Sequence, residues 1–121
     1  MNRLNKDVSK FRLDGQVALV TGSTRGIGWA IARGMAESGS TVYVNGRDKK
    51  VLAARCKNLI DSGYDAKPAF FDATNIEAIN RFLDYTDTPI DILVNNAAIR
   101  LRKPLSEISP KAFSEVLEAN L

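Results

Sequence analysis

One glycine-rich turn limits the folds open to this chain more than any other feature. The turn spans Thr21 to Gly28, with an apolar run at residues 17–20 before it and a helix-patterned run at residues 29–38 after it. A strand that enters such a turn and a helix that leaves it aim unpaired backbone N–H groups, and the positive end of the helix dipole, at one point. The context indicates a phosphate-binding turn. A tight turn without any ligand stays open as the alternative.

Strands and helices alternate along the rest of the chain. We expect strands at residues 16–21, 41–45, 67–71 and 90–95, and helices at residues 26–38, 49–61, 76–85 and from Pro110 onward. The first strand is apolar without alternation, as in a strand buried on both faces. This order predicts an α/β, Rossmann-like doubly wound parallel sheet of about four strands in the order 3-2-1-4. Residues 1–14 are expected as a polar N-terminal tail, and residues 15–121 as an incomplete dinucleotide-binding Rossmann domain.

Local patterns give three finer expectations. The inward face of the first helix is expected to consist of Ile27, Ala30, Ile31, Gly34 and Met35. Asp48 is expected to cap the second helix. Thr74 and Glu77 have the spacing of a capping box at the third helix.

Composition excludes several kinds of protein. The chain has no histidine and one cysteine, Cys56, which removes histidine-based nucleophile schemes, internal disulfides and the usual zinc sites, so we expect no metal. No membrane span or secretory signal is recognisable, and the cytoplasm is the expected compartment. The net charge of +3 is not gathered into a basic run, so nucleic-acid binding is not expected. A modest positive excess suits a phosphate-bearing ligand equally well.

The expected sheet order places the unusual turns together. Ligands of open parallel sheets bind outside the carboxyl ends of the strands, at the crevice where the strand order reverses, here between the first and fourth strands. All the unusual turns fall on that edge, at residues 22–28, 46–47, 72–73 and 95–98. The sequence therefore predicts one nucleotide site at this edge.

Two motifs carry a resemblance to a known family. The glycine turn reads Thr-Gly-x-x-x-Gly-x-Gly, and Asn95 to Ala98 read Asn-Asn-Ala-Ala. Both resemble signatures of the short-chain dehydrogenase/reductase family, and the likeness extends from Leu13 onward. Within the family the chain is most similar to gluconate 5-dehydrogenase and 3-oxoacyl-carrier-protein reductase types. The stretches 45–48, Asn-Gly-Arg-Asp, and 102–105, Arg-Lys-Pro-Leu, prompt the former comparison.

The resemblance implies an oxidoreductase that transfers hydride between a nicotinamide dinucleotide and a small alcohol or carbonyl substrate, such as a sugar acid or a 3-oxoacyl group. It implies that the turn wraps the pyrophosphate, that Asp72 and Ala73 meet the adenine, and that Asn95 and Ala97 line the crevice beside the ribose. The implied cofactor-binding residues are Gly22, Ser23, Thr24, Arg25, Gly26, Ile27, Gly28, Asn45, Arg47, Asp72, Ala73, Asn95 and Ala97.

The end of the second strand bears on the choice of coenzyme. NAD-selective sites place a carboxylate there, whereas this chain has Asn45 followed by Gly46 and Arg47. A guanidinium can pair with the 2′-phosphate of NADP, and Arg25 could be a second clamp, so the pattern favours NADP over NAD. The carboxylate of Asp48 argues against this preference for NADP. Arg47 could also be a solvated turn residue. Arg100 and Arg102 suggest an anionic substrate, or are simply solvated.

The chain departs from the family at the catalytic group. The family uses a tyrosine with a lysine four residues later and a serine ahead of it, but Arg47, Pro68 and Pro89 follow the three tyrosines here at that spacing. Only Asn120 matches a catalytic position, at which the family organises a water molecule. We therefore expect a chain truncated before the catalytic pair and inactive alone. A non-catalytic NADP-binding module and an inactive gene fragment remain the alternatives, and an oligomer stays open.

Ala98 is a second departure, because the family has glycine at this position. If the position requires a positive φ, alanine is strained there by roughly 1 kcal/mol or more.

Overall fold

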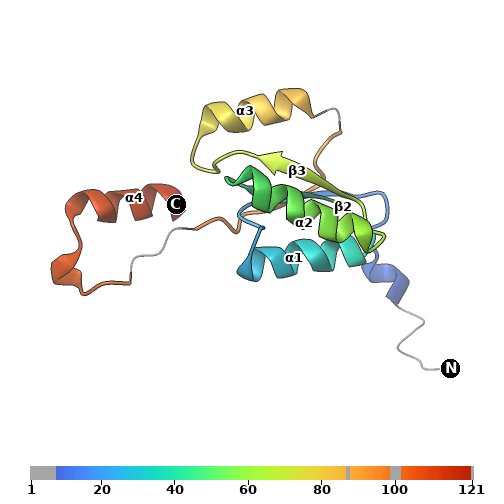
Figure 1. The fold of residues 1–121 in the computed structure, drawn as a ribbon, viewed down its shortest axis with the longest axis horizontal. Coiled ribbons are helices and arrows are strands. Elements are labelled where there is room, and N and C mark those ends of the chain that lie inside the picture. The colour runs from blue at the N-terminus through green and yellow to red at the C-terminus, as the bar shows by residue number, and fades with distance from the viewer. Residues whose placement is uncertain (1–7, 87, 99–101, 121) are drawn as a thin grey trace.

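A four-stranded parallel sheet forms the centre of the molecule (Figure 1). The computed structural model describes residues 8–86, 88–98 and 102–120. The strands are β1 (Val17–Val20), β2 (Thr41–Gly46), β3 (Ala66–Phe70) and β4 (Ile92–Val94). Their order is β3-β2-β1-β4, with Val17 opposite Thr41, Ala18 opposite Ile92, and Val42 opposite Ala66. The predicted α/β fold and strand order are confirmed.

Helices cover both faces of the sheet. In Figure 1, α1 (Gly26–Glu37) and α2 (Lys49–Asp61) lie on one face, and α3 (Ile76–Tyr85) lies on the other. A last helix, α4 (Pro110–Asn120), lies to one side of these layers. Two short 3-10 helices, η2 (Val8–Phe11) and η3 (Leu105–Glu107), complete the described elements. The bounds of α3 and the start of α4 agree with the sequence-based expectation.

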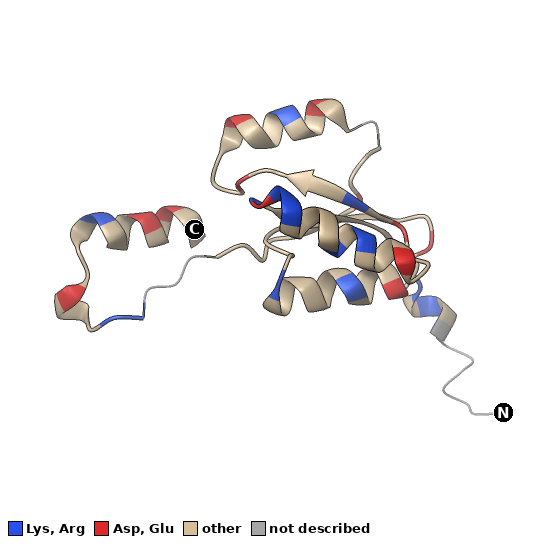
Figure 2. Cartoon of the chain, viewed as in Figure 1, with Lys and Arg blue, Asp and Glu red and all other residues tan. Residues whose placement is uncertain are grey.

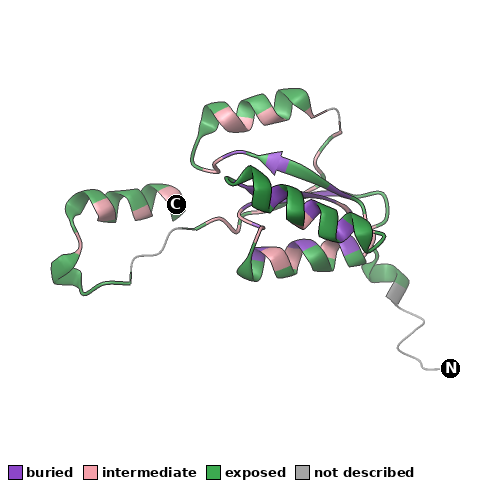
Figure 3. Cartoon of the chain, in the orientation of Figure 1, coloured by how far each residue is buried: buried purple, intermediate pink, exposed green. Residues whose placement is uncertain are grey.

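Two hydrophobic clusters explain why the first strand is apolar throughout. Val20, Val42 and Val44 pack with α1 and α2, whereas Leu19 and Tyr43 belong to a second cluster on the α3 face. Tyr43 meets Phe82 of α3 edge to face, with 5.4 Å between ring centroids. Buried positions concentrate in the strands and on the helix sides that face them (Figure 3). Because both faces of β1 are covered, no polar residue alternates along it.

The predicted inward face of α1 was wrong at three of its five residues, while Ile31 and Met35 do pack against the core. Ile27 is 67% exposed, and Ala30 and Gly34 are also exposed. The positions that α1 buries are Gly28, Ala32 and Ala36, with Trp29, Ile31 and Met35 partly buried beside them. Small side chains let a helix approach a sheet closely, so the alanines face the strands. The predicted face was centred too near Ile27 and Ala30, and it left out Ala32 and Ala36.

Helix caps gave one confirmed and one wrong prediction. The Asp48 side chain accepts hydrogen bonds from the backbone N–H groups of Lys50 and Val51, as expected of a cap. At α3 the cap is Asn75, whose side chain accepts from the N–H of Ala78 at 3.0 Å. The Thr74 hydroxyl lies one residue too early and donates to Asp72 instead, at 2.7 Å. The expected capping box is therefore absent.

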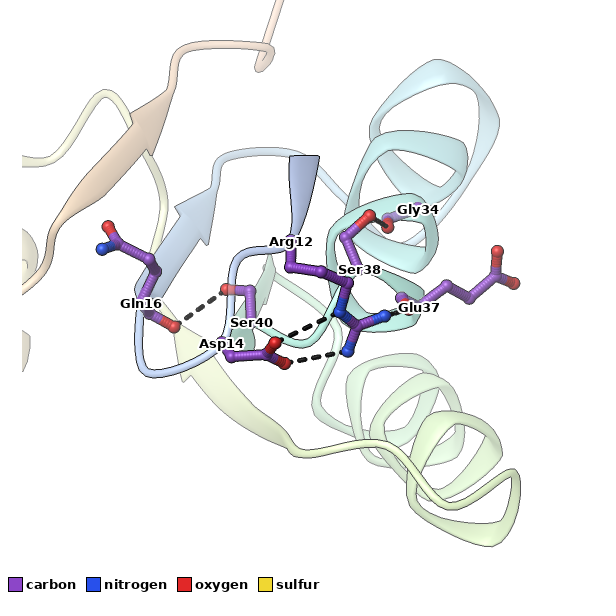
Figure 4. A network of polar contacts seen from close by, with 7 residues as sticks. All are labelled: Arg12, Asp14, Gln16, Gly34, Glu37, Ser38 and Ser40. Atoms are coloured by element: carbon purple, nitrogen blue, oxygen red, sulfur yellow. Dashed lines mark hydrogen bonds and ion pairs between the residues drawn. The ribbon is translucent and has the colours of Figure 1, made fainter. Parts of the chain in front are cut away.

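A polar clasp fastens the segment before β1 to the end of α1 (Figure 4). Both terminal nitrogens of the Arg12 guanidinium donate hydrogen bonds. Nη2 donates to Asp14 Oδ1 at 2.8 Å, and Nη1 donates to the carbonyl of Glu37 at 3.2 Å. The hydroxyl of Ser40 donates to the carbonyl of Gln16 at 3.1 Å. A cation beside the last carbonyls of a helix is favourably placed in the helix dipole. The boundary at residue 14 stays a prediction.

Candidate nucleotide site at the carboxyl edge of the sheet

Asn45 anchors the glycine turn to the sheet. This side chain, only 2% exposed, accepts a hydrogen bond from the N–H of Gly22 at 2.9 Å through its Oδ1. Its Nδ2 donates to the carbonyls of Ala69 and Phe71, both at 2.9 Å. The Asn45 amide therefore joins the turn to the neighbouring strand β3 and to the residue that follows it. These hydrogen bonds of the Asn45 side chain all go to backbone groups of the protein. Its expected contact with a coenzyme stays a prediction.

Ser23 has a similar internal role. Its hydroxyl is completely buried, donates to the carbonyl of Val20 at 2.7 Å and accepts from the N–H of Asn45 at 2.9 Å. The backbone N–H of Ser23 also donates to the carbonyl of Asn45 at 2.9 Å. The turn is thus fixed to the end of β2 by bonds in both directions.

Asn96 fastens the segment after β4 to the same turn. Its Nδ2 donates to the carbonyls of Thr21 and Gly22, at 3.1 and 3.0 Å. The hydroxyl of Thr21 donates to the carbonyl of Val94 and accepts from the N–H groups of Asn96 and Ala97. The Asn95-Asn96 motif is recognisable in the sequence, but the family resemblance implies roles only for Asn95 and Ala97. The paired asparagines mark Asn96, and the first position of the Thr-Gly-x-x-x-Gly-x-Gly motif marks Thr21, but neither motif indicates these contacts.

Three glycines leave room where the backbone turns. A Cβ at Gly28 would overlap Asn96 Nδ2 and the carbonyl of Gly22. Gly22 has a φ of +59°, and a Cβ there would lie 2.9 Å from the Cα of Ala97. Gly26 also has a φ of +59°, yet its Cβ would meet nothing within 4 Å. The first two glycines allow close packing, while Gly26 borders open space at the start of α1.

The start of α1 has the properties of an anion site. Arg25 occupies the cap position, and its side chain makes no capping hydrogen bond. The first N–H groups of a helix have no partner within the helix, so they can bind an anion. Basic residues, blue in Figure 2, occur at the starts of α1 and α2. The parallel strands β1 and β2 deliver both starts to one edge of the sheet.

Arg47 and Asp72 meet at the next position along this edge. The Nη1 atom of Arg47 lies 3.8 Å from Asp72 Oδ2, and the Arg47 side chain is 73% exposed. Hydrogen bonds from the N–H and hydroxyl of Thr74 lower the pKa of Asp72, and the positive charge of Arg47 adds to that effect. Asp72 is therefore a hydrogen-bond acceptor at neutral pH. Gly46 allows the Thr24 side chain to pack closely here, since a Cβ would lie 2.6 Å from the Thr24 methyl group.

A cavity of about 620 Å³ adjoins the turn and extends toward α3 and α4. It brings together four residues that the sequence singled out, namely Ala73, Asn95, Ala97 and Asn120. Its remaining walls are mostly apolar. The backbone of Ala98 carries no strain from a positive φ, since the only positive φ angles in the described residues are at glycines. Arg102 is exposed, and Arg100 lies outside the described residues.

The tyrosines lie elsewhere. Tyr43 is 7% exposed in the core, Tyr64 is half-buried against the core cluster on the α1 and α2 face, and Tyr85 is 86% exposed at the end of α3. None of them lines the cavity beside Asn95.

Among the residues that the structure describes, no cluster of acidic and cysteine side chains could hold a metal ion. Nor is any helix in this part of the chain long and apolar enough to span a membrane.

The fold and the turn define a Rossmann-like α/β domain with a glycine-rich nucleotide turn. The sequence pattern of the short chain dehydrogenases matches residues 16–121, and the chain belongs to that family.

Individual relatives agree with this assignment. Gluconate 5-dehydrogenase of Gluconobacter oxydans is 39% identical over 114 residues, which is 92% of this chain and 44% of the relative. A crystal structure of gluconate 5-dehydrogenase from Burkholderia cenocepacia, in complex with NADP and tartrate, matches with a TM-score of 0.83 and 40% identity, over 94% of this chain and 46% of that one. A 3-oxoacyl (acyl-carrier-protein) reductase from Agrobacterium tumefaciens with bound NADP matches with a TM-score of 0.84 and 34% identity, over 100% and 48%. The chain thus spans less than half the length of these relatives.

Proposed function

We propose that this chain forms the adenine-nucleotide half of an NADP site. The observation that carries the proposal is the turn of residues 22–28, which is fixed by Asn45, Ser23 and Asn96 and is open at Gly26. A rigid turn with free space at a helix start suits a pyrophosphate, because its donors need no reorganisation on binding. The NADP in two solved relatives supports the same ligand.

The residues at the edge fit the parts of this coenzyme. The backbone of Gly22 to Gly28 would hold the pyrophosphate, and the Asp72 carboxylate would accept a hydrogen bond from the adenine amine, with Ala73 beside it. Asn95 and Ala97, which line the cavity, would lie beside the ribose. The bound coenzyme supplies or accepts the hydride, whereas this chain binds and orients it.

Selectivity for NADP over NAD is proposed from the end of β2. An NAD site needs a carboxylate there to accept a hydrogen bond from the ribose 2′-hydroxyl. Asn45 occupies that place and uses its amide inside the protein. The exposed guanidinium of Arg47 follows, and a guanidinium favours a phosphate over a hydroxyl. Asp48 does not compete, because its carboxylate caps α2.

For the whole protein we propose an oxidoreductase acting on an alcohol/carbonyl pair in the cytoplasm. Relatives named for gluconate suggest a sugar acid, and those named for 3-oxoacyl groups suggest an acyl substrate. No Tyr-x-x-x-Lys occurs in these 121 residues, and none of the described tyrosines lines the cavity. We therefore propose that this chain alone binds NADP without turnover. That placement of the tyrosines equally favours a non-catalytic NADP-binding module or an inactive gene fragment.

Calorimetric titration of the chain with NADP and with NAD tests the proposal. We expect NADP to bind in the micromolar range and NAD to bind at least about tenfold more weakly, as loss of a charge-assisted pair predicts. Absence of NADP binding would contradict the proposed site, and equal affinities would contradict the role of Arg47. NADPH oxidation in the presence of 5-ketogluconate should not exceed the background rate without protein. Substrate-dependent oxidation would contradict the proposal that the chain lacks turnover.

A further inference from the structure

Arg55 of α2 reaches across to the glycine turn. Its Nε donates to the carbonyl of Thr24 at 2.7 Å, in a part-buried bond between residues 31 positions apart. The guanidinium carbon lies 4.7 Å from the centre of the Trp29 ring, in the first turn of α1. One half-buried side chain thus contacts three elements: α2 that carries it, the turn, and α1.

The bond to Thr24 fixes a peptide plane inside the turn. The carbonyl and the N–H of a trans peptide point in opposite directions, and the described residues contain no cis peptide. Holding the Thr24 carbonyl toward α2 therefore turns the N–H of Arg25 away from α2. Arg25 is the cap residue of α1, directly before the open position Gly26.

The Thr24 side chain lies against the end of β2. A Cβ at Gly46 would lie 2.6 Å from the Thr24 methyl group, so Thr24 packs closely on the residue before Arg47. Arg55 therefore fixes the direction of the peptide before α1, in a turn that also packs closely against the end of β2.

We propose that Arg55 is a positioning residue of the coenzyme site, an inference that rests on the proposed NADP binding. It holds the Thr24–Arg25 peptide in the orientation that receives the phosphates. The hydrogen bond from Nε performs this role, and the positive charge of the guanidinium is secondary. Without the bond the peptide is free to rotate, and binding must then order it again, which lowers affinity.

Two substitutions separate the hydrogen bond from the charge. In Arg55→Gln the side-chain nitrogen occupies the place of Nε, so the donor is kept and the charge is lost. Arg55→Met has similar length but neither donor nor charge. Arg33→Met is the matched control, since Arg33 is an exposed arginine of α1 whose Nε bonds Glu37, and its replacement changes the net charge equally. Far-UV circular dichroism and thermal melting establish that each variant is folded.

The expected results differ according to whether Arg55 acts through its hydrogen bond or through its positive charge. Arg55→Met should weaken NADP binding by about tenfold, while Arg55→Gln and Arg33→Met should stay within about threefold of the unmodified chain. Amide hydrogen exchange at residues 24–28, without coenzyme, should be faster in Arg55→Met and close to normal in Arg55→Gln. Unchanged affinity and exchange in Arg55→Met, or equal losses in Arg55→Met and Arg55→Gln, would overturn the positioning role while leaving the NADP site intact.

Two further outcomes are decisive. If the unmodified chain binds no NADP, the proposed function fails and the inference fails with it. If Arg55→Met does not fold, Arg55→Lys replaces it, because its ammonium keeps the charge but lies one bond beyond the Nε position. Weaker NADP binding by Arg55→Lys than by Arg55→Gln then supports the positioning role, and the reverse order overturns it.

Discussion

At the scale of the residue, the site depends on side chains that face the protein. Asn45, Ser23 and Asn96 direct their polar atoms to backbone groups of the turn and the strands. A buried amide that loses such bonds costs about 1–3 kcal/mol, so these residues hold the turn firmly. The groups that face outward for a ligand include backbone N–H groups, the exposed Arg25 and Arg47, and the Asp72 carboxylate.

Gly26 and Gly63 allow a matched test of the open space at the start of α1. Both have a positive φ and space for a Cβ, at +59° and +88°, but only Gly26 lies in the turn. We expect Gly26→Ala and Gly63→Ala each to lower the free energy of unfolding by about 1 kcal/mol, measured in urea. Only Gly26→Ala should also weaken NADP binding, because its methyl group enters the space of the phosphate. Equal NADP affinities of the two variants would argue against a ligand at this position.

Asp72 should make stability depend on pH. Hydrogen bonds from Thr74 lower its pKa in the folded chain, so its stabilising effect is complete above the unfolded pKa of about 3.9 and is lost as the pH falls through the lower folded-state pKa. The stability difference between the unmodified chain and Asp72→Asn should therefore shrink between pH 6 and pH 2. Urea midpoints across this range measure it, and a difference that stays constant or grows would contradict the prediction.

At the scale of the element, periodicity identified the helices and strands but not always their orientation. The strand order followed from alternation, and the Asp48 cap followed from the type and place of one residue. The face of α1 could not be predicted, because the close approach of the helix to the sheet depends on Ala32 and Ala36 fitting against strands far along the chain. Within the site, the motif residues were recognisable, Thr21 among them, whereas no local pattern marks the long-range contacts that Thr21 and Arg55 make.

The corrected orientation of α1 predicts unequal effects of substitution. Ala32 is completely buried and Ile27 is 67% exposed. Ala32→Leu should destabilise the chain by about 1–3 kcal/mol, because the added atoms push α1 from the sheet. Ile27→Ser should change stability by no more than about 0.5 kcal/mol. Urea unfolding of both variants measures this, and a larger loss for Ile27→Ser would restore the original orientation.

At the scale of the whole molecule, β3 and β4 form the two edges of the described sheet, and β4 carries an exposed leucine. Within the described part of the chain it pairs only with β1, and Leu93 in its centre is 56% exposed. Strands with an open apolar edge pair readily with other chains. This geometry predicts association at high concentration, and it limits how much of the substrate side this chain can provide.

A charge on β4 should reduce that association. We expect Leu93→Lys to lower the apparent mass at high concentration, measured by light scattering after size exclusion, because a lysine at an edge opposes strand pairing. Leu105→Lys is the control, since Leu105 is 80% exposed in η3 and the charge change is identical. A similar decrease with Leu105→Lys would point to general charge repulsion instead of the strand edge.

The bond from Asn96 to Gly22 has a consequence for how the molecule is made. Its two ends are 74 residues apart, and the bond from Asn45 to the same glycine spans 23. Contacts of long sequence separation form late, because the intervening loop must first close. During synthesis on the ribosome, the turn is made early, but its bonds from Asn96 can form only after residue 96 has left the exit tunnel. A nascent chain stalled before that point should therefore leave residues 22–28 open to protease.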